Sequence, residues 1–97
     1  MTLEEARLAL AACRREIDQI DRSLVALLNE RSRVVERIGE IKGEVSLPVY
    51  EPKREDEVYA NIAAANRGPL SKEAAQRVFE RIIDEMRTLQ RSRMEGK

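Results

Sequence analysis

One apolar seam runs through the first 41 residues and constrains the fold more than any other feature of this chain. Its members recur at alternating steps of three and four over five heptads: Leu3, Ala6, Leu10, Cys13, Ile17, Ile20, Leu24, Leu27, Val34, Ile38 and Ile41. This spacing is typical of a continuous helix packed lengthwise against other helices. Arg31 is the one break, and a guanidinium in such a seam must find an anion or cost several kcal/mol. Arg31 is therefore the first candidate site residue.

The seam is too long for one small chain to cover. The pattern predicts a helix from about Thr2, as N-cap, to Lys42 or Gly43, with Gly43 and then Pro48 ending it. Such a helix is a rod of roughly 60 Å, whereas a compact chain of 97 residues has a radius of gyration of only about 13 Å. A second copy of the chain must cover the rest, so the sequence predicts an intertwined homodimer.

Two shorter helices are predicted after the long one. Pro52 suits a first helical position, and the second helix is expected to end near Ala65, before the turn sequence at 66–69. Ser71 is the expected N-cap of the third helix, and the last residues, 94–97, are expected to fray. The apolar stripe of the third helix is Val78, Phe79, Ile82, Ile83, Met86 and Leu89. The predicted class is all-α, with one domain over 1–97.

The composition excludes several kinds of site. Eighteen basic and eighteen acidic residues leave no net charge, so no broad field draws in nucleic acid or an anionic membrane, and any anion site must be local. Histidine is absent and Cys13 is the only cysteine, which excludes a Ser-His-Asp triad, a Cys-His pair, a structural zinc site and an internal disulfide. No transmembrane run is present, so we expect a cytoplasmic protein.

The long helix carries the candidate cations. Lys42 follows Arg31 by eleven residues, which returns it to within about 20° of the same face, some 16 Å along the axis. Arg31 could instead reach water or pair with a glutamate across the interface. Arg14 lies about 100° off that face, where it could form an ordinary charge ladder with Asp18 and Arg22 or serve the other chain's groove in a dimer.

Further candidates lie on the shorter helices. Glu51, Arg54 and Glu55 fall in the first turn of the second helix, where carboxylates are expected from the helix dipole alone. Gln90 continues the apolar face of the third helix, four residues after Met86. A neutral amide at that place can donate a hydrogen bond into a groove without adding charge.

Six stretches carry a resemblance to a known family. They are residues 14–21, 27–31, 38–42, 47–55, 68–71 and 79–83, followed by Gln90. In this order they resemble the chorismate mutases of the all-helical class, over about Leu10 to Gln90. The resemblance implies an intertwined dimer with two active sites. Each site would take Arg31, Lys42, Arg54, Glu55 and Gln90 from one chain and Arg14 from the other.

The resemblance also implies a reaction, the rearrangement of chorismate to prephenate in phenylalanine and tyrosine biosynthesis, with no cofactor, metal or proton transfer. Arg14 and Arg31 would bind the two substrate carboxylates, and Lys42 and Gln90 would donate to the ether oxygen. Glu55 would accept from the ring hydroxyl with help from Glu51, and Arg54 would brace the loop and carboxylate region.

The chain departs from the family pattern at two places, and other functions stay open. Met86 stands where some members carry a small hydroxyl residue, and Glu51 is often Asp. The alternatives are an isochorismate pyruvate lyase, a regulatory or docking domain that binds an aromatic-pathway enzyme, and a bare helical dimerisation module. The chain's end at Lys97 favours a free enzyme, and Arg31 and Gln90 on apolar faces disfavour the bare module.

Overall fold

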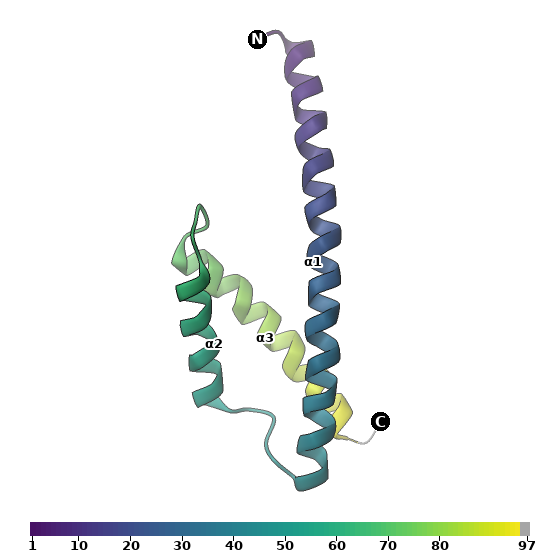
Figure 1. Cartoon of the computed structure of the whole chain (residues 1–97), viewed down its shortest axis with the longest axis vertical. Coiled ribbons are helices and arrows are strands. Elements are labelled where there is room, and N and C mark those ends of the chain that lie inside the picture. Colours follow the sequence, from purple (N-terminus) through teal and green to yellow (C-terminus); the bar gives the residue numbers. More distant parts are fainter. Residues whose placement is uncertain (96–97) are drawn as a thin grey trace. The chain divides into compact units, whose positions relative to one another are not determined.

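The computed structural model describes residues 1–95 and shows three helices, one long and two shorter (Figure 1). Helix α1 spans Leu3–Val45, α2 spans Pro52–Ala65 and α3 spans Lys72–Met94. No strand occurs within the described residues. The all-α prediction is confirmed. Met94 is the last helical residue, and residues 96 and 97, which were expected to fray, lie outside the described part of the chain.

A reciprocal cap starts α1 where the sequence predicted a cap. The Glu5 N–H donates to Thr2 Oγ1 at 3.1 Å, and the Thr2 N–H donates to Glu5 Oε1 at 2.8 Å. Both hydrogen bonds satisfy N–H groups that a helix leaves without partners in its first turn. Hydrogen bonds from the backbone N–H and the side chain of Thr2 lower the pKa of Glu5, because they stabilise its carboxylate.

The predicted end of α1 at Lys42 or Gly43 was wrong by two to three residues. The helix continues through Gly43 to Val45, and Ser46, the residue after it, has a positive φ of 59°. The Leu47 N–H then donates to the Lys42 carbonyl oxygen at 3.0 Å, which is the closing bond of a Schellman turn. Gly43 instead lies where α1 meets Met94.

The turn between α2 and α3 follows the predicted chemistry. Asn66 Oδ1 accepts from the Gly68 N–H at 3.0 Å, and its amide nitrogen donates to the Leu70 carbonyl oxygen at 2.9 Å. Gly68 has a φ of +72°, and Ser71 Oγ accepts from the Ala74 N–H at 3.0 Å as the cap of α3. Helices α2 and α3 therefore pack together as a pair running in opposite directions (Figure 1).

The chain divides into two compact units, Met1–Arg33 and the part from Val34 onward. The first unit is the N-terminal portion of α1. None of residues 1–33 is buried, and the large apolar seam residues of this unit are all exposed: Leu3, Leu10, Ile17, Ile20, Leu24 and Leu27. The described residues contain no helix that is both long enough and apolar enough to cross a membrane.

The second unit holds the core. Its buried apolar side chains are Val35 of α1 and Ala75, Ile83 and Met86 of α3. Gly39 brings the two helices close, because a Cβ atom there would lie 2.8 Å from the Gln90 carbonyl oxygen. The predicted α3 stripe is confirmed at Ile83 and Met86, whereas Val78 lies at the edge of that face and is exposed in the single chain.

Candidate active site

Lys42 is the centre of a polar cluster in the second unit. Its side chain is 12% exposed and lies in the last turn of α1. Lys42 Nζ donates to Gln90 Oε1 at 2.7 Å, pairs with Glu51 Oε1 at 3.0 Å and donates to the Val49 carbonyl oxygen at 3.4 Å. An ammonium group has three N–H donors, and three oxygen atoms lie within 3.4 Å of Lys42 Nζ. The structure thus brings together three of the predicted residues, Lys42, Glu51 and Gln90.

Local structure explains how residues so far apart in sequence meet. Lys42 is held where the Schellman turn closes α1, and Glu51 is the extended N-cap residue of α2. Gln90 lies opposite Gly39, where α1 and α3 approach closely enough for backbone contact. The Lys42 and Gln90 side chains, 48 residues apart in the sequence, therefore meet at hydrogen-bond distance.

The Gln90 amide can offer its nitrogen to a ligand in this arrangement. Its carbonyl oxygen accepts from Lys42, which turns the amide nitrogen to the other side as a donor. Glu51 partly offsets the positive charge of Lys42. The cluster can therefore present an ammonium and a neutral N–H donor to one oxygen atom that gains negative charge.

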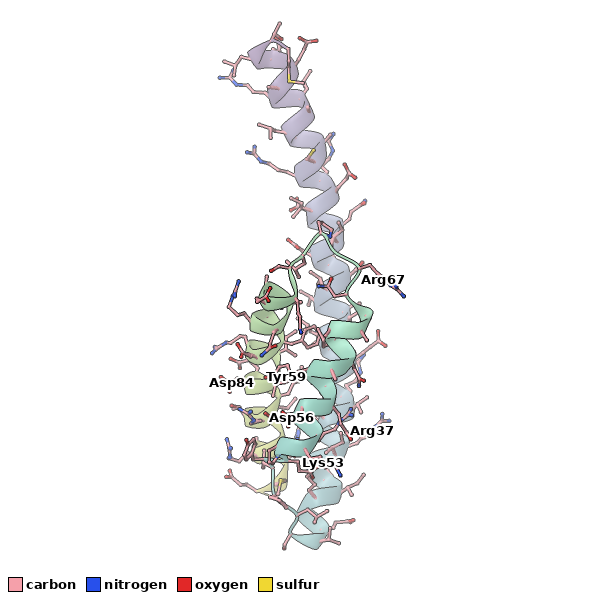
Figure 2. The ribbon with its side chains drawn as sticks, turned by 90° about the vertical axis from the view of Figure 1, so that its left-hand side faces the viewer. Arg37, Lys53, Asp56, Tyr59, Arg67 and Asp84 are labelled. Carbon is pink, nitrogen blue, oxygen red and sulfur yellow. The ribbon has the colours of Figure 1, made fainter. Side chains whose placement is uncertain are left out.

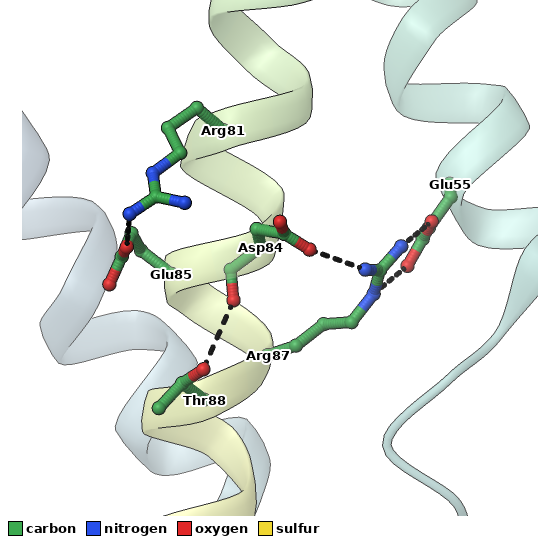
Figure 3. Close-up of polar contacts among 6 residues, drawn as sticks. All are labelled: Glu55, Arg81, Asp84, Glu85, Arg87 and Thr88. Atoms are coloured by element: carbon green, nitrogen blue, oxygen red, sulfur yellow. Dashed lines mark hydrogen bonds and ion pairs between the residues drawn. The ribbon is translucent and has the colours of Figure 1, made fainter.

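Glu55 belongs to a second polar group one helical turn further along α2. Arg87 of α3 donates through Nε to Glu55 Oε2 at 2.7 Å, and its Nη2 pairs with Glu55 Oε1 (Figure 3). Arg87 Nη1 also donates to Asp84 Oδ1 at 2.9 Å, and the guanidinium lies 5.4 Å from the centroid of the Tyr50 ring. The hydrogen bonds that Arg87 donates to Glu55 raise the pKa of Arg87.

Tyr59 lies beside this second group, on α2 and next to the helix that carries Asp84 (Figure 2). Burial raises the pKa of the Tyr59 hydroxyl, and the nearby carboxylates of Glu80, Glu55 and Asp84 raise it further. Tyr59 therefore stays a neutral phenol beside the Glu55–Arg87 pair at physiological pH.

Arg54, the other predicted cation of the second unit, is not part of the Lys42 cluster. The Arg54 guanidinium pairs with Glu57 at 3.3 Å on the exposed side of α2. Arg14 is exposed and Arg31 is half-buried, and both belong to the unit formed by residues 1–33. Within the second unit, Lys42 is therefore the predicted cation that contacts other predicted site residues.

The sequence reasoning missed two residues that shape the site. Arg87 lies four residues after Ile83 and three before Gln90, so its position on the inner face of α3 was the signal that could have found it. Gly39 is an isolated glycine inside a helical pattern, which usually has a packing reason. Met86, one of the two departures from the family pattern, is a buried core residue. Within residues 1–95, no three His, Cys, Asp or Glu residues gather into a possible metal site.

Comparisons with known proteins identify the family. The family described as chorismate mutase type II matches residues 13–91. A bifunctional chorismate mutase/prephenate dehydratase of Aquifex aeolicus is 37% identical over 86 residues, which cover 84% of this chain and 24% of that protein. A chorismate mutase of Methanocaldococcus jannaschii is 28% identical over 87 residues, which cover 89% of this chain and 88% of that protein. The chain thus spans about a quarter of the bifunctional relative and most of the shorter one.

A solved structure matches the backbone as well. The chorismate mutase (Form II) of Thermus thermophilus superposes with a TM-score of 0.82 at 38% identity, covering 84% of this chain and 93% of that one. Its Form I structure gives a TM-score of 0.77 at the same identity, covering 80% of this chain and 98% of that one. On the match over residues 13–91 and on this backbone similarity, the chain belongs to the chorismate mutase type II family.

Proposed function

We propose that this chain is a chorismate mutase, an isomerase that converts chorismate into prephenate by an intramolecular Claisen rearrangement. The observation that carries the proposal is the contact of Lys42 Nζ with Gln90 Oε1 at 2.7 Å. This contact brings a cation and a neutral amide together, which supports the proposal that both donate to one oxygen atom. Membership of the family and the mutase names of the relatives support the same activity.

The donors act on the charge that develops during the rearrangement. The C–O ether bond breaks ahead of the new C–C bond, no proton moves, and negative charge gathers on the ether oxygen. Lys42 and the Gln90 amide nitrogen stabilise that charge, and a preorganised donor of this kind contributes about 3 kcal/mol. The longest Lys42 contact, to the Val49 carbonyl oxygen at 3.4 Å, is the one that the substrate replaces at least cost.

The remaining site residues select the reactive conformer. Arg31 and the partner's Arg14 bind the two carboxylates, Glu55 accepts from the ring hydroxyl with help from Glu51, and Arg54 braces the loop and carboxylate region. This holds the compact conformer in which the two reacting carbons approach each other. A millionfold rate gain needs about 8 kcal/mol, which two donors and conformer selection together can supply.

The working form in this proposal is an intertwined homodimer of single-domain chains, located in the cytoplasm. Its support is the row of exposed apolar side chains along residues 3–27, which a second chain would cover. The dimer also supplies Arg14 across the interface. The two relatives described above are named a chorismate mutase and a bifunctional chorismate mutase/prephenate dehydratase, which favours a mutase over the lyase.

The test is a direct assay of the purified chain. We expect the ultraviolet absorbance of chorismate to fall and the product to be prephenate. Release of pyruvate from isochorismate would identify a lyase instead. No turnover of either substrate by a folded dimer would indicate a regulatory or docking domain and contradict the proposal.

A further inference from the structure

We propose that Arg87 is a positioning residue for the substrate site, and that it holds the Glu55 carboxylate in the orientation in which this group accepts the ring hydroxyl. The inference rests on the proposed function, because Glu55 needs a substrate hydroxyl to accept. Arg87 acts through Glu55 and needs no contact with the substrate itself.

The first support is the geometry of the Glu55–Arg87 pair. Arg87 binds both carboxylate oxygens, Oε2 through Nε at 2.7 Å and Oε1 through Nη2 (Figure 3). Two parallel hydrogen bonds fix the plane of a carboxylate, which a single contact cannot do. A carboxylate offers about four lone-pair positions, so Glu55 keeps acceptor sites for a hydroxyl while it is held.

The second support is that Arg87 is itself held in place from two further sides. Asp84 Oδ1 accepts from Arg87 Nη1 at 2.9 Å, and the Tyr50 ring centroid lies 5.4 Å from the guanidinium carbon. Arginine has a long side chain with much rotamer freedom to lose. These contacts restrict that freedom before any ligand arrives, so the orientation of Glu55 is set in advance.

The third support is the position of the pair beside the Lys42 cluster. Arg87 precedes Gln90 by three residues on one face of α3. Glu51, the N-cap residue of α2, precedes Glu55 by four residues, so the start of α2 carries one partner of each group. The Arg81–Glu85 pair differs: it lies within α3 only, and its arginine side chain is 76% exposed. It is a matched control on the same helix (Figure 3).

The experiment compares Arg87→Met with Arg81→Met in the full-length chain, with chorismate as substrate. We expect Arg87→Met to lower kcat/KM about tenfold to hundredfold, mostly through a higher KM, since it costs one hydrogen bond to a charged group. Arg81→Met should stay within about twofold of the wild type, as a typical exposed pair does. Unchanged kinetics in Arg87→Met would overturn the inference.

A double-mutant cycle with Glu55→Gln separates positioning from a merely structural role. If Arg87 acts through Glu55, Arg87→Met should change kcat/KM by less than about twofold in the Glu55→Gln background. An equal loss in both backgrounds would mean that Arg87 only supports the fold and would overturn the inference. Circular dichroism and size-exclusion chromatography check that each variant folds.

Arg87→Lys keeps the cycle informative if Arg87→Met does not fold. Lysine retains the charge but cannot bind both oxygens in a fixed plane, so its loss should be smaller and should again vanish in the Glu55→Gln background. A wild-type chain without mutase activity would overturn the proposed function and this inference with it. An active wild type with additive losses would overturn this inference alone.

Discussion

In the unit that begins at Val34, the apolar side chains of Val35 and Met86 are 7% and 8% exposed, whereas Ile17 and Leu24 of residues 1–33 are 53% and 51% exposed. Ile17, Leu24 and Met86 belong to apolar stripes predicted from the sequence, whereas Val35 lies one position after the seam residue Val34. In the second unit α3 lies against the face of α1 that carries Val35 and Gly39, whereas the seam residues of this unit, Val34, Ile38 and Ile41, are exposed like those of the first unit. Helical spacing therefore defines an apolar face, and a packed neighbour decides whether that face becomes a core.

The largest effect should come from a charge placed in the open seam. We expect Leu24→Glu to abolish the proposed homodimer and much of the helix content, because a carboxylate without a partner costs several kcal/mol to bury and each such dimer would contain two copies. Size-exclusion chromatography with light scattering and circular dichroism would measure this. Gln19→Glu adds the same charge outside the seam and should leave the dimer intact. If the Leu24→Glu variant still formed a dimer with an unchanged thermal midpoint, the seam would not be an interface.

Loss of one cation from either unit should reduce turnover by orders of magnitude. We expect Arg31→Ala or Lys42→Ala to lower kcat, by about 10²- to 10³-fold in the case of Lys42, with the helical dimer unchanged. Lys53→Ala removes a lysine from the exposed side of α2 and should stay within about twofold (Figure 2). Near-normal steady-state rates in Arg31→Ala or Lys42→Ala would refute the assignment of that residue.

Gln90→Glu tests the neutral donor in the second unit. A carboxyl group can donate a hydrogen bond only when it is protonated, so we expect the variant to lose activity at neutral pH and to recover part of it in acid. The measurement is the pH profile of kcat/KM for the variant and the wild type. A profile of unchanged shape would argue against Gln90 as the donor to the ether oxygen.

Two glycines of α1 offer a matched test of the packing in the second unit. A Cβ at Gly39 would lie 2.8 Å from the Gln90 carbonyl oxygen, whereas one at Gly43 would lie at an ordinary 3.4 Å from Met94. Gly39→Ala should therefore lower the free energy of unfolding by about 1–3 kcal/mol and displace Gln90 with a loss of activity. Gly43→Ala should be neutral or stabilising by up to about 1 kcal/mol. Equal unfolding midpoints for the two variants would contradict this packing.

The smallest effect should come from the cap of the first unit. Thr2→Ala removes the hydroxyl but keeps the Thr2 N–H donor, so the pKa of Glu5 should rise part of the way toward its ordinary value of 4.5. Because folding lowers this pKa, the cap stabilises the helix above pH 4.5 and loses that effect as the pH falls through the folded value. An NMR titration of Glu5 measures the shift, and an identical curve in Thr2→Ala would contradict it.

Local sequence signals accounted for most of the fold. The seam, the Thr2 and Ser71 caps, Pro52 and the 66–69 turn predicted three helices, and the structure places the helices there. The end of α1 was misplaced because Gly43 was taken as a terminator, although the helix continues through it to Val45 and Ser46 adopts the positive φ. In a sequence, a glycine inside a helical pattern can mark either the end of the helix or a close contact with another helix.

For the site, the sequence indicated the residue types and their faces but few of their contacts. Lys42 contacts both Glu51 and Gln90 in the structure, and all three are candidates from the sequence. Their selection rested partly on the family resemblance. The Glu55–Arg87 pair was missed, because its partners are 32 residues apart and an arginine on a helix usually reaches solvent.

Periodicity, caps and prolines act within a few residues of the chain. The sequence could therefore specify three helices, their apolar stripes and two cations, Arg31 and Lys42, near one face of the long helix. Packing set the rest. How closely α1 approaches α3 depends on the missing side chain at Gly39, and that distance determines whether Lys42 reaches Gln90. Which carboxylate Arg87 binds depends in turn on how α2 lies against α3. Contacts of this kind depend on the distance between elements and on rotamers, which no local spacing in the sequence encodes.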